Sequence, residues 1–233
     1  MTSMPTTAQG FAAYFDHTLL KPTATPSEIA QVCAEAREFS FAAVCVNGVY
    51  LARVVRALAG SAALPIAVVG FPLGAMTTRD KAMETRHLVE DGAREIDMVL
   101  SLGAFLSGER GQAGDDIHAV VGAAGKVPVK VIIETAFLTS DQIADATVLC
   151  AEARAAFVKT STGFGPRGAS KEDILTMAAT ITRMGAKSNG LKIKASGGIR
   201  TLETARTMIE AGAHRIGSSN SVQMVKEFAA SLA

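Results

Sequence analysis

The sequence predicts an α/β fold in which one domain forms a closed (β/α)8 TIM barrel. Eight short apolar runs alternate with segments of helical pattern, and such alternation implies parallel strands joined by crossover helices. The chain has 233 residues, a length that suits one barrel of this kind. No linker or shift in composition divides it. We therefore expect residues 1–233 to form a single barrel domain, with residues 1–13 as an N-terminal extension that closes the barrel bottom.

The expected strands are runs of four to seven residues in which apolar and β-branched side chains dominate. Runs of this length and composition, bounded by turn residues, are typical of strands buried in a parallel sheet. The eight ranges are Tyr14–Thr18, Phe41–Val46, Ile66–Phe71, Glu95–Leu100, Val129–Thr135, Ala156–Ser161, Lys192–Ser196 and His214–Gly217.

The segments between these strands begin with helix-capping residues. Thr25 is followed by proline at the first helical position and by Glu28 three residues on, which is the spacing of a capping box. Apolar residues at helical spacing follow the caps. The same or a similar offset begins at Thr139, Ser170, Thr201 and Asn220, and Gly92, Gly185 and Gly212 stand where helix C-terminal glycines are expected.

Two segments give weaker signals. The fourth crossover, residues 101–127, contains six glycines, so we expect a loop there before a helix near residues 115–124. At the N-terminus, residues 6–13 are expected to form the short helix of the bottom-closing extension.

The composition excludes several classes of protein. A net charge of +1, two tyrosines and no tryptophan give no basic or stacking surface for nucleic acid, and nothing that favours an anionic membrane. No apolar stretch is long enough to span a bilayer, and residues 1–9 do not resemble a secretory signal. The cysteines Cys33, Cys45 and Cys150 are expected to be reduced and buried, so we expect a cytoplasmic protein.

The most unusual residue is Lys159, in the middle of an apolar strand. Burying a charged lysine is costly, so such a residue either pairs with a carboxylate or serves as a neutral amine. Strand parity places Lys159 on the same side as Phe157 and Ser161. Because the other side is apolar and suits the helices, we expect Lys159 to face the barrel interior and to form a Schiff base with a carbonyl substrate.

The same parity argument gives other strands a polar inward side. Equal numbers of acids and lysines result, and we expect them to compensate one another. Active sites of such barrels lie at the C-terminal ends of the strands. We therefore assign chemistry to Lys159, Lys194 and Asp97, and a structural role to Glu95, Lys130 and Lys192. The whole inward set is Asp16, Glu95, Asp97, Glu134, Lys130, Lys159, Lys192 and Lys194.

Glycines and hydroxyl residues after the last strands indicate a phosphate site. Gly197 and Gly198 follow the seventh strand, and Gly217, Ser218 and Ser219 follow or end the eighth, just before a helix. Backbone N–H groups and a helix N-terminus hold an anion in this position. We expect a phosphorylated substrate, with further binding residues at Thr18, Cys45, Thr162, Gly163 and Arg200.

Histidine and cysteine chemistry are less favoured. The four histidines lack the spacing of metal ligands, so we expect no metal and no cofactor. His17 is at most a supporting residue near the pocket. Cys45 has no evident histidine partner, which favours a small core residue over a nucleophile.

Taken together, these motifs resemble the deoxyribose-phosphate aldolase family over residues 14 to about 222. The resemblance implies a metal-free class I aldolase on a (β/α)8 barrel, a homodimer or homotetramer, that cleaves 2-deoxy-D-ribose 5-phosphate to acetaldehyde and D-glyceraldehyde 3-phosphate. It implies Lys159 as the Schiff-base lysine, Lys194 as the cation that lowers its pKa, Asp97 as acid/base and Asp16 as outer support. The motifs are Asp16-His-Thr-Leu-Leu-Lys-Pro22, Glu95-Ile-Asp-Met-Val99, Val129-Lys-Val-Ile-Ile-Glu-Thr135, Val158-Lys-Thr-Ser-Thr-Gly163, Lys194-Ala-Ser-Gly-Gly-Ile-Arg200 and Arg215-Ile-Gly-Ser-Ser219.

Two departures from the family pattern are visible. Phe164 stands where some members have a second lysine, and the chain ends Glu227-Phe-Ala-Ala-Ser-Leu-Ala233 without the C-terminal tyrosine of some members. Two alternatives remain open. One is another Schiff-base aldolase of transaldolase or ketose-phosphate type, and the other is a phosphosugar-binding barrel without activity.

Overall fold

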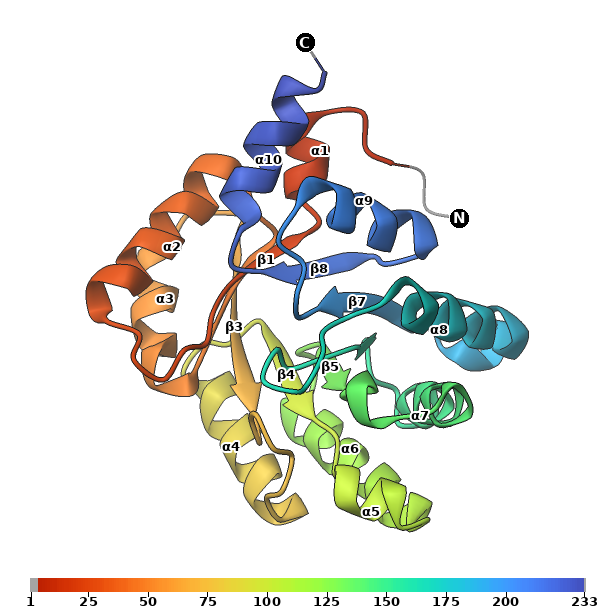
Figure 1. Cartoon of the computed structure of the whole chain (residues 1–233). Coiled ribbons are helices and arrows are strands. Elements are labelled where there is room, and N and C mark those ends of the chain that lie inside the picture. Colours follow the sequence, from red (N-terminus) through yellow and green to blue (C-terminus); the bar gives the residue numbers. More distant parts are fainter. Residues whose placement is uncertain (1–3, 233) are drawn as a thin grey trace.

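The computed structural model describes residues 4–232, and these form a closed barrel of eight parallel strands surrounded by helices (Figure 1). Each strand pairs with its neighbour in the sequence, and β8 closes the ring on β1. The predicted fold is confirmed. The strands are β1 Phe15–Leu19, β2 Ala43–Val46, β3 Leu64–Val69, β4 Glu95–Val99, β5 Val129–Ile132, β6 Phe157–Lys159, β7 Lys192–Ser196 and β8 Arg215–Ser218.

Helices connect consecutive strands on the outside of the barrel. The capping boxes predicted at Thr25, Thr139 and Ser170 are all present, because each side chain accepts from the third helical N–H and receives the reciprocal bond. The α-helices are α1 Ala8–Ala12, α2 Pro26–Phe39, α3 Leu51–Ala57, α4 Thr78–Glu90, α5 Leu102–Leu106, α6 Arg110–Ala124, α7 Ser140–Glu152, α8 Lys171–Met184, α9 Leu202–Ala211 and α10 Ser221–Ala230, and the 3-10 helices are η1 Gly48–Tyr50, η2 Thr135–Phe137 and η3 Gly185–Ser188.

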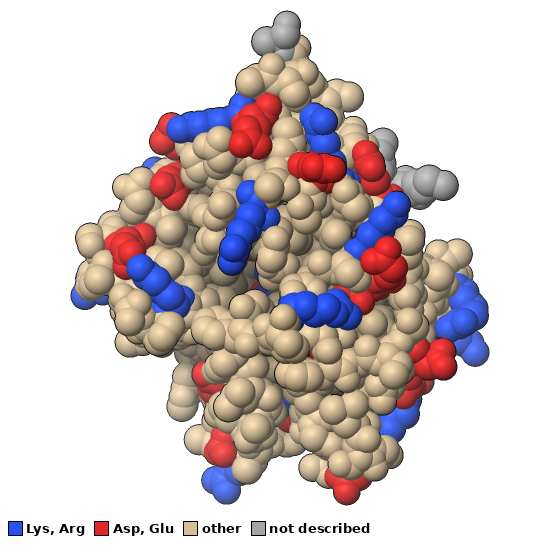
Figure 2. Space-filling model, viewed as in Figure 1, with Lys and Arg blue, Asp and Glu red and all other residues tan. Residues whose placement is uncertain are grey.

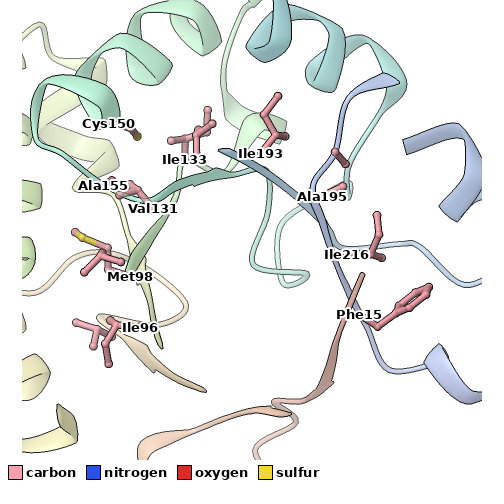
Figure 3. Close-up of a cluster of buried hydrophobic side chains, with 14 of the residues drawn as sticks. Phe15, Ile96, Met98, Val131, Ile133, Cys150, Ala155, Ile193, Ala195 and Ile216 are labelled. Atoms are coloured by element: carbon pink, nitrogen blue, oxygen red, sulfur yellow. The ribbon is translucent and has the colours of Figure 1, made fainter. Parts of the chain in front are cut away.

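Alternate side chains of the strands point outward into the main hydrophobic core between barrel and helices. Figure 3 shows Ile96 and Met98 of β4, Val131 of β5 and Ile193 of β7 on this outer side. The opposite parity points inward. A small apolar cluster lines the interior on β1 to β3, and it consists of Leu20, Ala43, Cys45, Ile66 and Val68. The charged side chains therefore gather in the remaining sector of the barrel.

The fourth crossover differs from the prediction. Instead of a loop before one helix, it contains the short helix α5 and then α6, which begins at Arg110. The Arg110 guanidinium donates to Asp145 and Glu152 of α7, at 2.9 Å each. These ion pairs with α7 lie at the first turn of α6, in a glycine-rich stretch where local sequence gives little helical preference.

One predicted cap is also wrong. The side chain of Asn220 caps no helical N–H, because its backbone φ and ψ of −103° and 21° are not those of a capping residue. Its own N–H donates instead to the Ser218 hydroxyl at 3.0 Å. The end of β8 and the start of α10 are thereby tied together.

The short helix α1 packs beside α10. The Phe11 ring stacks on Phe228 of α10, with centroids 4.4 Å apart, and meets the edge of Phe15 at 5.1 Å. The expected helix over residues 6–13 is therefore present as residues 8–12. Its closure of the barrel bottom stays a prediction, and residues 1–3 of the expected extension lie outside the described residues.

The described surface shows two features that bear on partners. Figure 2 shows lysine and arginine side chains interspersed with acidic ones, with no continuous area of either sign on the face in view. In addition, none of the helices within residues 4–232 is long and apolar enough to cross a membrane.

Candidate active site

A pocket of about 370 Å³ opens at the C-terminal ends of the strands. At its floor is Lys159, the last residue of β6, and around it stand the loops that follow β1, β6, β7 and β8. All nine predicted binding residues other than Cys45 line this pocket. They are Thr18, Thr162, Gly163, Gly197, Gly198, Arg200, Gly217, Ser218 and Ser219.

Lys159 is buried inside the barrel, with 3% of its surface exposed. Its Nζ donates to Oδ2 of Asp97 at 2.7 Å. Burial lowers the pKa of Lys159 because it penalises the charged amine, and the nearby Lys194 cation lowers it further. Asp97 raises the pKa, but its attraction does not outweigh the two opposing effects. The amine of Lys159 therefore loses its proton more readily than an ordinary lysine does.

Lys194 behaves in the opposite way, although it is equally buried. Its Nζ donates to the same Oδ2 of Asp97 at 2.7 Å and to Oδ2 of Asp16 at 2.5 Å. Burial would lower the pKa of Lys194, but the two carboxylates outweigh this effect and hold it well above its usual value. Lys194 is thus charged beside Lys159 in the resting site, and the two lysines share one acceptor oxygen.

The two aspartates remain ionised. Burial would raise the pKa of Asp16, but Lys194, Lys130 and Arg215 lower it to about 2. For Asp97, the attraction of its three lysine neighbours likewise outweighs burial, so its pKa lies well below its usual range. Because the Asp97 carboxylate stays charged, we expect it to assist proton transfer by orienting the groups that donate to it, rather than by holding a proton itself.

The inward ion-pair network contains one more cation than it has carboxylates. Among the described residues it joins three acids to four basic side chains, rather than the four of each expected from parity. Lys130 donates to Asp97 at 3.0 Å and pairs with Glu95 at 2.5 Å. Arg215 pairs with Asp16 at 2.6 Å and reaches Glu95 at 3.6 Å. The members are Asp16, Glu95, Asp97, Lys130, Lys159, Lys194 and Arg215.

Two residues expected in the network lie elsewhere. Lys192, the first residue of β7, is exposed at the N-terminal end of the barrel, with its Nζ 5.9 Å from the centre of the Phe157 ring. Glu134 follows β5 with a left-handed backbone, φ 48° and ψ 66°, so strand parity no longer applies to it. Its Oε2 instead accepts from the N–H of Thr162 at 3.1 Å and from the Thr162 hydroxyl.

Glu134 therefore fixes the loop after β6. The Thr162 hydroxyl, which donates to Glu134, accepts in turn from the N–H of Phe164 at 3.0 Å. Thr162, Gly163 and Phe164 all line the pocket. A left-handed non-glycine residue costs energy and persists only where its surroundings determine it. Here the hydrogen bonds between Thr162 and the buried Glu134 carboxylate hold the backbone in this conformation.

Some residues that line the pocket have backbone N–H groups without an acceptor among the described residues. Among the described residues, no acceptor is found for the N–H groups of Gly163, Gly198 and Ser219. All three residues line the pocket, and Ser219 directly precedes Asn220 at the start of α10, where the helix dipole also favours an anion. Arg200 also lines the pocket, exposed, without an ion pair among residues 4–232. This arrangement can hold a phosphate group above the lysines.

A protein-family model of the DeoC/LacD family aldolases matches residues 11–224. The chain belongs to this aldolase family. The deoxyribose-phosphate aldolase of Brevibacillus brevis is 49% identical over 212 residues, which cover 91% of this chain and 93% of that protein. The resemblance noted from the motifs is therefore confirmed.

Solved structures agree with this membership. A candidate deoxyribose-phosphate aldolase from Coccidioides immitis gives a TM-score of 0.93 at 40% identity, covering 96% of this chain and 87% of that one. The deoxyribose phosphate aldolase of Aeropyrum pernix, described as tetrameric, gives a TM-score of 0.86 at 29% identity. The match covers 95% of this chain and 92% of that one.

Two sequence interpretations change within this DeoC/LacD aldolase. Cys45 does not line the pocket. It is fully buried, its Sγ lies 3.9 Å from Asp97, and burial raises its pKa to about 11. His17 faces the helices rather than the pocket rim, with its Nε2 2.6 Å from Glu35 and its ring against Phe41. Within the described part of the chain, no cluster of His, Cys, Asp and Glu is arranged to hold a metal ion.

Two residues of the site were missed. Lys21 lines the pocket and carries a second exposed cation, which Glu28 of α2 holds in an ion pair. Arg215 shares the inward parity of Gly217 on β8, and counting that strand as the others were counted would have found it. The signal for Lys21 was weaker, because it stands in a loop where strand parity gives no direction.

Proposed function

We propose that this aldolase reversibly cleaves 2-deoxy-D-ribose 5-phosphate to acetaldehyde and D-glyceraldehyde 3-phosphate through a Schiff base on Lys159. One observation carries the proposal. A buried lysine of lowered pKa, hydrogen-bonded to a carboxylate that it shares with a second, charged lysine, lies at the floor of a pocket whose lining suits phosphate.

The covalent step begins with the uncharged amine of Lys159. Its nitrogen attacks the C1 aldehyde carbon of the open-chain sugar, and loss of water from the resulting carbinolamine leaves an iminium. Removal of the proton from the C3 hydroxyl breaks the C2–C3 bond, so that C3 becomes the aldehyde of glyceraldehyde 3-phosphate. The electron pair moves to form an enamine, which takes a proton at C2 and is hydrolysed to acetaldehyde and free Lys159.

The surrounding charges support each of these steps in the proposal. Lys194 keeps a positive charge beside Lys159, which disfavours protonation of the free amine. Asp97 accepts hydrogen bonds from both amines and remains anionic. It can therefore stabilise the cationic iminium and relay protons, through Lys194 or a water molecule, to and from the reacting atoms. Asp16 holds Lys194 in position from the other side.

The phosphate is proposed to lie against the N–H groups of Gly163, Gly198 and Ser219, with Arg200 as a further contact. Arg200→Met should raise KM for deoxyribose 5-phosphate by about tenfold, since a contact to a charged group is worth about 1.5–3 kcal/mol, and should leave kcat nearly unchanged. Steady-state assays with phosphorylated and unphosphorylated deoxyribose test this. The unphosphorylated sugar is the control, because its KM should not respond. Equal losses with both sugars would contradict a phosphate contact.

The decisive experiment is reductive trapping. The protein is incubated with acetaldehyde and sodium borohydride, digested, and mapped by mass spectrometry. A mass increase of one ethyl group on the peptide containing Lys159 supports the Schiff base. An unmodified Lys159, with deoxyribose 5-phosphate still bound in a calorimetric titration, would favour a phosphosugar-binding protein without activity. Trapping without release of acetaldehyde from deoxyribose 5-phosphate would favour an aldolase with a different donor.

We further propose that the protein acts as a homodimer or homotetramer in the cytoplasm. The Aeropyrum pernix relative is described as a tetramer, and size-exclusion chromatography with light scattering measures the number of subunits here.

A further inference from the structure

Arg215 and Glu95 lie at the opposite end of the barrel from the pocket. Each is the first residue of its strand, and neither lines the pocket. Arg215 pairs with Asp16 at 2.6 Å, and Glu95 pairs with Lys130 at 2.5 Å. Asp16 is also the partner of Lys194, so Arg215 connects to the reactive end of the network through one shared carboxylate. The side chains of Arg215 and Glu95 are 16% and 6% exposed, so solvent screens them little.

An inward aromatic ring lies near the bottom of the barrel. Phe157 of β6 is 6% exposed, and the Arg215 guanidinium and the Lys130 amine each lie 5.7 Å from its ring centre. The ring quadrupole attracts both cations. Arg215 is therefore held inside the barrel although it shares its carboxylate partners with Lys194 and Lys130, and it brings the number of cations in the described network to four against three carboxylates.

An enclosed network with surplus positive charge favours the loss of one proton. Arg215 is a guanidinium and cannot supply it. Within the described residues, Lys194 and Lys130 each contact at least two carboxylates, whereas Lys159 contacts Asp97 alone. Lys159 also lies closest to the pocket opening. The proton that restores neutrality therefore comes from Lys159.

We propose that Arg215 is a positioning residue that, without touching substrate, supplies the surplus positive charge which keeps the Lys159 amine uncharged. The inference rests on the proposed function, because it concerns the state of the proposed Schiff-base lysine. Glu95 acts in the opposite sense, since it offsets part of that charge through Lys130.

All charged or titratable groups that face Lys159 from the neighbouring strands enter this balance. Six strands besides β6 contribute, and β3 presents only apolar side chains to the interior. The groups are Asp16 of β1, Cys45 of β2, Glu95 and Asp97 of β4, Lys130 of β5, Lys194 of β7 and Arg215 of β8.

The sign of each change follows from the charge that is removed. Arg215→Gln takes away one positive charge, so the pKa of Lys159 rises and the acidic limb of reactivity moves to higher pH. Glu95→Gln takes away one negative charge, so the acidic limb moves to lower pH. Two charges about 10 Å apart at an effective dielectric constant of about 20 shift a pKa by about one unit. We therefore expect shifts of about one pH unit in opposite directions.

The experiment measures the rate of Lys159 modification by acetaldehyde and cyanoborohydride as a function of pH, read by peptide mass spectrometry. It is carried out on the full-length protein and on Arg215→Gln, Glu95→Gln, the double variant and Arg215→Lys. The double variant, with its charge count restored, should return close to the wild-type profile. Arg215→Lys keeps the charge and is the matched control, so its profile should stay within about 0.3 pH units of wild type.

The outcomes separate this inference from the proposed function. Trapping at Lys159 in wild type, with opposite shifts in the two glutamine variants, supports it. Trapping with unshifted profiles, or with both profiles shifted the same way, overturns the role of Arg215 and leaves the Schiff base intact. Failure to trap wild type overturns the proposed function itself. If Arg215→Gln does not fold, Glu95→Gln still decides, because a profile that does not move to lower pH contradicts the charge balance.

Discussion

Lys159→Leu is expected to abolish turnover of deoxyribose 5-phosphate, with kcat reduced at least about 10⁴-fold, as for other covalent nucleophiles. Leucine has a similar volume but no amine, so no iminium can form and the C2–C3 bond has no electron acceptor. Lys159 is 3% exposed at the pocket floor. The measurement is acetaldehyde release in an enzyme-coupled assay, together with the loss of trapping by borohydride.

A matched control is available on the neighbouring strand. Lys192 stands on β7 and, like Lys159 on β6, has inward parity, but it is exposed at the other end of the barrel. Lys192→Leu should therefore retain turnover within about twofold, because exposed substitutions of this kind change little. Retention of more than one hundredth of wild-type kcat in Lys159→Leu would exclude it as the essential amine.

Lys194→Leu should lower kcat by about 10³-fold near neutral pH. Loss of the cation raises the pKa of Lys159, since Lys194 is one of the causes that lower it. The reactive fraction of Lys159 therefore falls, and the remaining activity should rise toward alkaline pH. Proton relay through Lys194 is lost as well, which general acid–base catalysis makes worth about 10²–10⁴-fold. The pH dependence of kcat/KM separates the two effects.

The same substitution tests the ion-pair network. Asp16 and Asp97 each lose a buried partner within 2.7 Å, which costs about 3–5 kcal/mol of unfolding free energy. Thermal and urea unfolding measure this loss. Lys194→Arg keeps the charge and should recover most of the stability but not the activity, because a guanidinium does not relay protons. Full activity of Lys194→Leu at neutral pH would contradict its assigned place beside Lys159.

Strand parity and the C-terminal-end rule were sufficient to predict much of the site. They placed Asp97, Lys159 and Lys194 inside the barrel because the alternating apolar residues, such as Ile96 and Met98, needed the helix-facing side. The barrel itself followed from eight alternating units. The inward placement of these residues and the barrel fold both follow from local sequence, because they depend on side-chain periodicities of about two residues in strands and about 3.6 residues in helices.

The remaining features depended on contacts between distant residues. Glu134 left the expected network because β5 ends at Ile132, and a left-handed turn then directs its carboxylate to Thr162. Helix α6 begins earlier than its composition predicts, at the turn where Arg110 meets α7. Strand parity does not predict the direction of a side chain beyond the end of its strand. Helix propensity does not predict an ion pair between two helices.

The pairing of β8 with β1 has a consequence for when the amine becomes reactive. Asp16 arises near the start of the chain, whereas Lys194 and Arg215 arise near its end, and the register Asp16↔Gly217 brings them together. On the ribosome, an incomplete chain that stops before β7 offers Lys159 neither its neighbouring cation nor its enclosure. It is then an ordinary protonated lysine. Under the proposed mechanism the enhanced reactivity of Lys159 thus arrives only with the last strands, and a nascent or unfolded molecule reacts with aldehydes at this position no faster than at any other exposed lysine.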